Sequence, residues 1–387
     1  MGTPIYLDYH ATTPVDPRVL EAMLPYFTER FGNPASKGHA FGWRAQEAVE
    51  TARGHVASLI SASSKEIVFT SGATESNNLA IKGVACALKG QGDHVITVVT
   101  EHKSVLDSCA RLEREGWKVT RLPVEPDGFV NLDVLRASLT DGTVLVSVMA
   151  ANNEIGVLQP LADIAAIVHE RGALLHTDAA QAFGKVPIDV AASGVDLLSL
   201  TAHKCYGPKG TGALYLRRQR PRLPIECQID GGGHEGGLRS GTLNVPGIVG
   251  LGACAEIAKR TLPEESVRLA GLRDRLLEGL RAGLDGIRVN GSLERRLPHN
   301  LHVSFDRIEG EALLMALGDI AVSTGSACSS GSGAPSHVLQ GIGAVADRAG
   351  ASIRFGLGRW TTDADIDAAL ERVVTVVRSL RERHPVA

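Results

Sequence analysis

Polar side chains follow several apolar segments of this 387-residue chain, and together they offer a varied set of chemical groups. Ser71-Gly72-Ala73-Thr74-Glu75 follows segment 66–70, and Glu101-His102 follows segment 94–100. Three later segments, at 143–149, 173–177 and 195–200, are also followed by polar groups. These are the amides of Asn153 and Gln181, the acid of Asp178, the hydroxyl of Thr201, the imidazole of His203 and the amine of Lys204. Taken singly, each has a structural explanation, because a small-residue turn before a helix is often an ordinary N-cap.

As a set, these groups match the requirements of a pyridoxal phosphate site. In such a site a lysine forms a Schiff base with the cofactor, and an aspartate keeps the pyridine nitrogen protonated. A helix N-terminus with small residues, such as the one expected after Gly72, exposes backbone N–H groups to the phosphate. The sequence therefore predicts that Lys204, Asp178 and the segment around Gly72 belong to one site.

The segments that precede these groups predict the sheet that must position them. Seven short apolar segments predict strands, at 66–70, 94–100, 119–122, 143–149, 173–177, 195–200 and 212–216. Between them, residues 76–88, 104–115 and 161–171 have the apolar spacing of amphipathic helices. This alternation predicts an α/β fold with a mostly parallel sheet and helices on both faces. Ligands of such sheets bind beyond the carboxyl ends of the strands, where the polar groups lie.

The rest of the chain predicts a smaller α+β unit. A helical pattern over 248–280, with a break near Pro263, leads to predicted strands at 301–305 and 352–354 and a helix at 363–381. We expect a large domain over 16–260 and a small domain made of 1–15 and 261–387. The small domain contains the segment STGSACSSGSG at 323–333, whose composition is that of a flexible loop.

Composition excludes several classes of protein. The 40 Lys+Arg and 43 Asp+Glu leave a net charge of −3, which gives no reason to expect nucleic-acid or membrane-surface binding. No apolar run approaches the ~18 residues of a membrane span, and residues 1–10 lack a secretory pattern, so a cytoplasmic enzyme is expected. The six cysteines include no two within four residues, which argues against a metal site and a disulfide framework.

Three further patterns carry competing interpretations. Segment 231–236 contains GxGxxG, but no helix start follows it, so the dinucleotide interpretation fails. Arginines at 217, 218, 220 and 222 indicate a solvated loop rather than a nucleic-acid patch, since no aromatics alternate with them. Lys209 rivals Lys204 as the Schiff-base lysine, although its Pro/Gly setting indicates a turn further from the strand end.

A collinear series of motifs then carries a resemblance over nearly the whole chain. The motifs are YLDYHATTPVDPRV at 6–19, FGNPAS at 31–36, FTSGATESNN at 69–78, TEHKSVL at 100–106, VMAANNEIG at 148–156, HTDAAQAFGK at 176–185, AHKCYGPKG at 202–210, LRSGT at 238–242, STGSACSSG at 323–331, SHVL at 336–339 and IRFGLGR at 353–359. With these motifs the chain resembles cysteine desulfurases of the NifS/IscS kind. These enzymes belong to the class V aminotransferase branch of the fold-type I pyridoxal phosphate enzymes.

The resemblance implies a role for each residue of the cofactor site. Lys204 would form the Schiff base, and His102 would stack on the cofactor ring. Asp178 would bind the pyridine nitrogen and Gln181 the phenolic oxygen. The phosphate would be held by a group of small and polar residues, namely Gly72, Ala73, Thr74, Thr201 and His203. Thr242 would reach the phosphate of the neighbouring subunit, which implies a homodimer.

The resemblance also implies the substrate site and the reaction. Asn153 and Arg354 would bind the carboxylate of L-cysteine, a task that suits the planar fork of arginine. Lys204 would remove the Cα proton, with His102 taking part in proton movements. Cys328 would attack the substrate sulfur, leaving L-alanine and a persulfide that passes to an acceptor such as an iron–sulfur scaffold. A thiol with this task needs exposure and mobility, whereas Cys205 is expected to be a small filler residue.

Two other enzymes and one non-enzyme remain as alternatives. A class V aminotransferase needs no thiol, so Cys328 argues against it. A selenocysteine lyase is the second alternative, although STGSACSS resembles the long-loop subgroup rather than the selenocysteine-favouring one. A non-catalytic interaction protein on the same fold would be supported by the loss of Lys204, Asp178 or Cys328, and all three are present.

Overall fold

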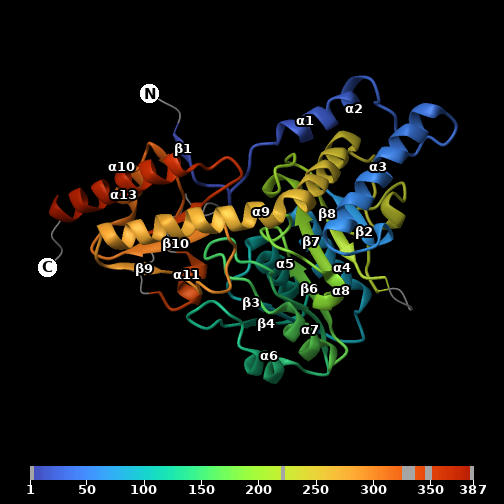
Figure 1. The fold of residues 1–387 in the computed structure, drawn as a ribbon. Coiled ribbons are helices and arrows are strands. Elements are labelled where there is room, and N and C mark those ends of the chain that lie inside the picture. The colour runs from blue at the N-terminus through green and yellow to red at the C-terminus, as the bar shows by residue number, and fades with distance from the viewer. Residues whose placement is uncertain (1–3, 219–222, 325–335, 345–350, 384–387) are drawn as a thin grey trace.

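A seven-stranded sheet forms the centre of the larger part of the molecule in this computed structural model, which describes residues 4–218, 223–324, 336–344 and 351–383 (Figure 1). The order across the sheet is β2 (Ile67–Thr70), β8 (Gly212–Leu216), β7 (Leu197–Thr201), β6 (Leu174–Asp178), β5 (Thr143–Ser147), β3 (His94–Val98) and β4 (Lys118–Leu122). Only β8 runs antiparallel to its neighbours. The predicted α/β fold with a mostly parallel seven-stranded sheet is confirmed.

Helices cover both faces of this sheet, as the alternation predicted. On one face pack α4 (Ala73–Ala87) and α5 (Lys103–Arg114), through buried side chains such as Leu79 and Leu112. On the other lie α3 (Ala40–Leu59), α6 (Leu132–Ser138), α7 (Leu161–His169), α8 (Val190–Ser193) and the first half of α9 (Val245–Gly283). The short helices α1 (Pro17–Met23) and α2 (Pro25–Thr28) lie beside α9 and α3 (Figure 1).

The predicted break near Pro263 is wrong, because α9 runs unbroken through that residue. A proline inside a helix removes one hydrogen bond and bends the axis rather than ending the helix when both flanks are held by packing. Here Ala258 packs in the core beneath the large sheet, and Leu269 packs in a second core beyond the proline. Figure 1 shows α9 changing direction between its two halves.

The second core belongs to a smaller α+β unit. An antiparallel sheet of order β12 (Ser352–Gly356), β10 (Asn300–Phe305) and β9 (Ile287–Val289) packs against the second half of α9 and against α13 (Asp363–Arg383). The unit also contains α10 (Gly310–Ala316), α11 (His337–Gly341) and the parallel pair β1 (Ile5–Tyr6) and β11 (Ile320–Ala321). Leu7 packs in this core, so the N-terminal segment joins the smaller unit. Among the described helices, none combines the length and apolar character that a membrane crossing needs.

Candidate active site

A cavity of about 550 Å3 lies at the carboxyl ends of the sheet strands and gathers most of the predicted site residues. Ten of them line it, namely Gly72, Ala73, Thr74, His102, Asn153, Asp178, Gln181, Thr201, His203 and Lys204. Thr242 and Arg354 are described but do not line it, and Cys328 lies outside the described residues. The segments that supply the ten residues are far apart in the sequence, so the fold itself assembles the cavity.

One wall of the cavity is the turn from β2 into α4. Gly72 begins the helix with φ of 151°, a conformation that suits glycine because it has no Cβ. No side chain caps this helix start, and the Glu75 carboxylate instead accepts the backbone N–H of Ser71 at 2.9 Å. The first N–H groups of a 15-residue helix, together with its dipole, suit an anion such as a phosphate.

His203 stands beside this turn as a neutral imidazole. Burial, together with the charges of Lys204 and Lys209, lowers its pKa to about 4. Its Nδ1 lies 3.1 Å from the hydroxyl of Thr12, which also lines the cavity. His203 is therefore a neutral hydrogen-bonding group at neutral pH and adds no charge to this wall.

A hydrogen-bond network connects the acid and the imidazole of the site. Asp178, at the end of β6, accepts the backbone N–H of Ala180 at 2.8 Å on Oδ1 and the Asn77 amide at 2.7 Å on Oδ2. The same amide donates to Ser104 Oγ at 2.8 Å, and Ser104 Oγ lies 2.8 Å from His102 Nδ1. Asn77 and Ser104 lie in motifs that the sequence analysis quoted, but their part in the site was missed.

This network sets the proton position on His102. Its Nδ1 accepts the backbone N–H of Ser104 and lies within hydrogen-bond distance of the Ser104 hydroxyl. Because the Ser104 oxygen accepts the Asn77 amide, the hydroxyl donates its hydrogen to Nδ1. Burial lowers the pKa of His102, more than the nearby Asp178 carboxylate raises it. The ring is therefore neutral near pH 7 and carries its proton on Nε2.

Lys204 lies in a short 3-10 turn (Ala202–Lys204) directly after β7. The hydroxyl of Thr13 donates to the His203 carbonyl at 2.9 Å and accepts the Tyr206 N–H at 3.0 Å, which fixes both sides of the turn. Lys209 also lines the cavity, but it is exposed, whereas Lys204 is half-buried. This exposure is consistent with the expectation that Lys209 lies further from the strand end than Lys204. Both lysines nevertheless line the cavity.

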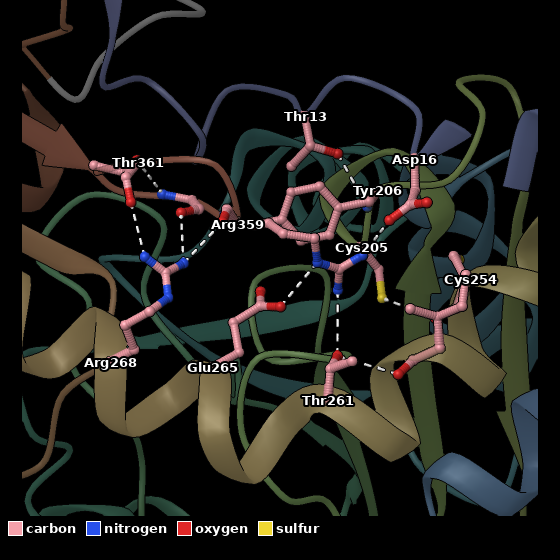
Figure 2. A network of polar contacts seen from close by, with 12 residues as sticks. Thr13, Asp16, Cys205, Tyr206, Cys254, Thr261, Glu265, Arg268, Arg359 and Thr361 are labelled. Carbon is pink, nitrogen blue, oxygen red and sulfur yellow. Dashed lines mark hydrogen bonds and ion pairs between the residues drawn. The ribbon is translucent and has the colours of Figure 1, made fainter. Parts of the chain in front are cut away.

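Tyr206 connects this turn to the smaller unit (Figure 2). Its backbone has φ of +62°, which is unfavourable for a bulky residue. Its ring contacts two cationic side chains, with Lys185 Nζ 3.8 Å and Arg359 Cζ 4.1 Å from the ring centre. The Arg359 guanidinium pairs with Glu265 at 2.8 Å and with Asp16 at 2.7 Å. The backbone N–H of Arg359 donates to the Tyr206 hydroxyl at 2.6 Å. The turn that carries Lys204 is thus held from several sides.

The predicted substrate residues lie next to one another. Arg354, on β12, is buried, donates to the Asn153 carbonyl at 2.8 Å and pairs with Asp8 at 2.7 Å. Among the described residues, neither Asn153 Oδ1 nor Arg354 Nε has a hydrogen-bond partner, although both are buried. Arg354 therefore lies behind Asn153 rather than on the cavity wall.

The glycine-rich stretch at 231–237 has a structural task that the sequence did not reveal. Glu235 reaches back to Arg53 with two contacts of 2.6 and 2.8 Å and accepts the Phe69 N–H of β2 at 2.8 Å. Further along, Arg239 pairs with Glu75 at 2.9 Å, beside the cavity wall. Thr242 follows this stretch and is exposed.

Removing the Glu235 carboxylate is expected to destabilise the fold. Its side chain is 2% exposed, so Glu235→Ala removes the buried carboxylate of Arg53 and leaves the Phe69 N–H without its acceptor. Arg53 then keeps only the more exposed Glu50 and the Ile67 carbonyl. Breaking such a pair costs about 3–5 kcal/mol, measurable as a lower free energy of unfolding in urea. Glu50→Ala removes the other carboxylate of Arg53, which is 49% exposed, and is expected to cost less than about 1 kcal/mol. Equal losses in the two variants would contradict this assignment.

The residues of the cavity fit pyridoxal phosphate. An uncapped helix start lines the cavity and suits a phosphate, and a buried acid with both oxygens hydrogen-bonded lines the same cavity. A half-buried amine and a neutral imidazole complete the set, in a cavity of a size common for cofactor sites.

Comparison with known proteins gives the same picture. A family model described as aminotransferase class-V matches residues 5–369. The chain is 59% identical to cysteine desulfurase IscS of Anaeromyxobacter sp. (strain Fw109-5), over 100% of this chain and 95% of that protein. It is 53% identical to cysteine desulfurase IscS of Rickettsia bellii (strain OSU 85-389), over 99% and 93%.

Solved structures agree with the sequence comparison. The fold superposes on a NifS-like protein with a TM-score of 0.90 and 39% identity, covering 98% of this chain and 100% of that one. It superposes on SspA in complex with cysteine with a TM-score of 0.82 and 38% identity, covering 92% and 100%. The chain belongs to the class V aminotransferase family.

Proposed function

We propose that this chain is a pyridoxal-phosphate-dependent cysteine desulfurase. It converts L-cysteine to L-alanine and passes the sulfur, as a persulfide on Cys328, to acceptors for iron–sulfur cluster assembly. The observation that carries the proposal is the cavity that joins Lys204, Asp178 and His102 in a chain 59% identical to a curated cysteine desulfurase over its full length. SspA, a structural relative, is described in complex with cysteine, which supports the substrate.

The residues of the cavity divide the work of binding and proton transfer. Bound pyridoxal phosphate supplies an electron sink for the electron pair left at the substrate Cα. Lys204 would bind the cofactor and move the Cα proton, while Asp178 would keep the ring nitrogen protonated and Gln181 would donate to the phenolic oxygen. His102 would stack on the ring. The start of α4 and the side chains beside it would hold the phosphate, namely those of Gly72, Ala73, Thr74, Thr201 and His203.

Four residues are proposed to act on the substrate, namely Asn153, Arg354, His102 and Cys328. Asn153 lines the cavity, and Arg354 supports it from behind by donating to the Asn153 backbone carbonyl. Both residues are proposed to hold the substrate carboxylate, Asn153 through its amide N–H and Arg354 by fixing the Asn153 backbone. His102, with its proton on Nε2, is placed to exchange a proton with the substrate. Cys328 supplies the thiolate that attacks the substrate sulfur.

A second copy of the chain is the proposed structural partner. Large apolar side chains are exposed on α1, α2, the start of α3 and the segment between them, namely Leu20, Leu24, Phe27, Phe31, Phe41 and Trp43. Exposed clusters of this kind mark protein interfaces. Trp43 and His234 line one hollow, so this face adjoins the stretch that leads to Thr242. The location supports a homodimer in which Thr242 reaches the partner's phosphate.

The division into domains follows the two cores. We place the large domain at 16–260 and the small domain at 1–15 and 261–387. Ala258 is the last α9 residue in the core of the large sheet, and Leu269 is the first in the second core, so Pro263 lies between them. A working free thiol suits a reducing compartment, which supports a cytoplasmic location.

Incubation of the holoenzyme with L-cysteine and a thiol reductant tests the function. The expected products are alanine and sulfide in equal amounts, because the sulfur leaves while the amine stays on the carbon skeleton. A ketoacid in place of alanine would support a class V aminotransferase and overturn the proposal.

Cys328→Ser distinguishes the desulfurase from a selenocysteine lyase. The variant is expected to keep the cofactor absorbance and to lose at least about 10²-fold in sulfide formation, because serine is a far weaker nucleophile toward sulfur. Cys205→Ser is the matched control, since Cys205 is buried and is expected to leave turnover within about threefold. Retention of cysteine turnover by Cys328→Ser would show that the thiol assignment is wrong.

A further inference from the structure

A buried histidine that the mechanism does not use touches a residue of the cofactor site. His10 follows β1 and contacts Gln181 of the cavity, and its side chain is almost entirely buried. Its Nδ1 is 3.0 Å from Gln181 Oε1, and its Nε2 is 3.1 Å from Asn300 Nδ2 on β10 of the smaller unit. The ring thus joins Gln181 to a strand that is more than a hundred residues away in the sequence.

The partners of Asn300 fix the direction of this chain of hydrogen bonds. Arg296, which can only donate, points Nη1 at Asn300 Oδ1 at 3.3 Å. The carbonyl of Glu154, which can only accept, takes Asn300 Nδ2 at 2.9 Å. These two contacts assign oxygen and nitrogen of the Asn300 amide, so the nitrogen is the end that faces His10. Nε2 of His10 is therefore an acceptor.

The direction continues through His10 to the cavity. Burial lowers the pKa of His10 well below its ordinary value, assisted by the charges of Arg354, Lys204 and Lys185. Burial also lowers the pKa of His299, whose ring stacks on His10, so this facing ring is neutral as well. The neutral ring accepts on Nε2, so its proton is on Nδ1 and is donated to Gln181 Oε1. Gln181 Nε2 donates one hydrogen to the His10 carbonyl at 3.1 Å. Its second hydrogen is left for the cavity.

We propose that His10 is a positioning residue that fixes the Gln181 amide so that it presents N–H, and not C=O, to the phenolic oxygen of the cofactor. The hydrogen bonds run in one direction from Arg296 through Asn300 and His10 to Gln181. This inference rests on the proposed function, because it concerns the cofactor of that site. A flipped Gln181 amide would place its carbonyl against the negative phenolic oxygen. The series of hydrogen bonds from Arg296 to Gln181, called the relay below, excludes that arrangement.

The relay has a spectroscopic consequence. The negative charge on the phenolic oxygen is greatest after the proton has left the lysine-bound cofactor, so an N–H donor favours that form. Loss of the donor therefore raises the pH midpoint of the absorbance change. His10→Leu is expected to raise the midpoint by about one pH unit, a tenfold change in proton affinity. His10→Asn places an amide nitrogen near the position of Nδ1 and is expected to restore most of the difference.

Titration of the holoenzyme absorbance, without substrate, tests the proposal. His94→Asn is the matched control, because His94 is a buried histidine with both nitrogens bonded to threonines at the opposite end of the sheet. It is expected to lower stability and leave the midpoint unchanged. A His10→Leu protein with the parent midpoint, or a shift of equal size in His94→Asn, overturns the relay.

Two further outcomes are separated by the same titration. If His10→Leu does not fold, Asn300→Ala removes the donor to Nε2 and carries the same expected direction, so an unchanged midpoint there also overturns the relay. A parent chain without any pyridoxal absorbance overturns the proposed function, and the relay with it. A parent that titrates while both variants match it overturns the relay alone.

Discussion

Replacing Lys204 with alanine is expected to abolish covalent attachment of pyridoxal phosphate and to lower turnover of L-cysteine by at least about 10³-fold. Lys204 follows β7 in a turn that Thr13 fixes on both sides, so its amine is held at the cavity. The side chain is half-buried and lines the cavity. Reduction of the holoenzyme with borohydride, followed by peptide mapping, locates the attached lysine directly.

Lys209→Ala is the matched control for this prediction. Its amine lines the same cavity but is exposed, in a turn where Gly210 has φ of +74°. The variant is expected to keep covalent attachment, with turnover within about tenfold of the parent because one cation near the phosphate is lost. A reduced label on Lys209, or none on either lysine, would show that the site is assigned to the wrong amine.

The turn around Lys204 also explains why its position depends on distant segments. Tyr206 keeps an unfavourable backbone conformation because Thr13, Asp16 and Arg359 all contact it (Figure 2). Strain of this kind persists only where the surroundings fix it. Arg359 belongs to the smaller unit, and Glu265 lies on α9 just beyond Pro263, so the two units meet at the residue that follows Lys204 by two positions.

The sheet and the main cavity residues were predictable from the sequence because they depend on local patterns. Each strand carries a short apolar pattern, and each predicted group follows a strand end, so the parallel sheet brings Gly72, Asp178 and Lys204 to one edge. The chemistry of these groups could be assigned before their distances were known. The bend at Pro263 was misjudged because the packing that holds both flanks of the helix is not visible in the local pattern.

The hydrogen-bond partners were not predictable in the same way. Asn77 and Ser104 come from two different helices, and only the folded structure shows that one amide serves both Ser104 and Asp178. His10 and Asn300 are 290 residues apart, and no periodic pattern connects them. Glu235 could have been suspected from a lone acid among glycines, but its partner Arg53 lies on α3. Side-chain networks of this kind depend on tertiary geometry rather than on local propensity.

Replacing Asp178 with asparagine is expected to lower turnover by about 10²–10³-fold while the chain stays folded. The carboxylate accepts Ala180 N–H on one oxygen and the Asn77 amide on the other, so both oxygens are acceptors. An asparagine can accept at only one of these positions, and its NH2 group then faces another donor. The neutral amide also removes the negative charge that keeps a proton on the cofactor ring nitrogen, and without that proton the ring is a weaker electron sink.

Two variants separate the charge of Asp178 from its packing. Thr177→Val changes the adjacent residue, whose side chain points to the opposite face of β6 and whose buried hydroxyl has no hydrogen-bond partner among the described residues. It is expected to keep turnover within about twofold, because no hydrogen bond is lost.

Asn77→Ala keeps the acid but removes one of its hydrogen-bond donors. Turnover is expected to fall about tenfold, the equivalent of one hydrogen bond of roughly 1.4 kcal/mol. If the carboxylate acts by its charge, kcat falls in the order Thr177→Val, Asn77→Ala, Asp178→Asn. Cofactor absorbance and thermal unfolding are measured on each protein as well. If Asp178→Asn turned over no more slowly than Asn77→Ala, the hydrogen bonds alone would account for the effect, and the charge of Asp178 would have no separate role.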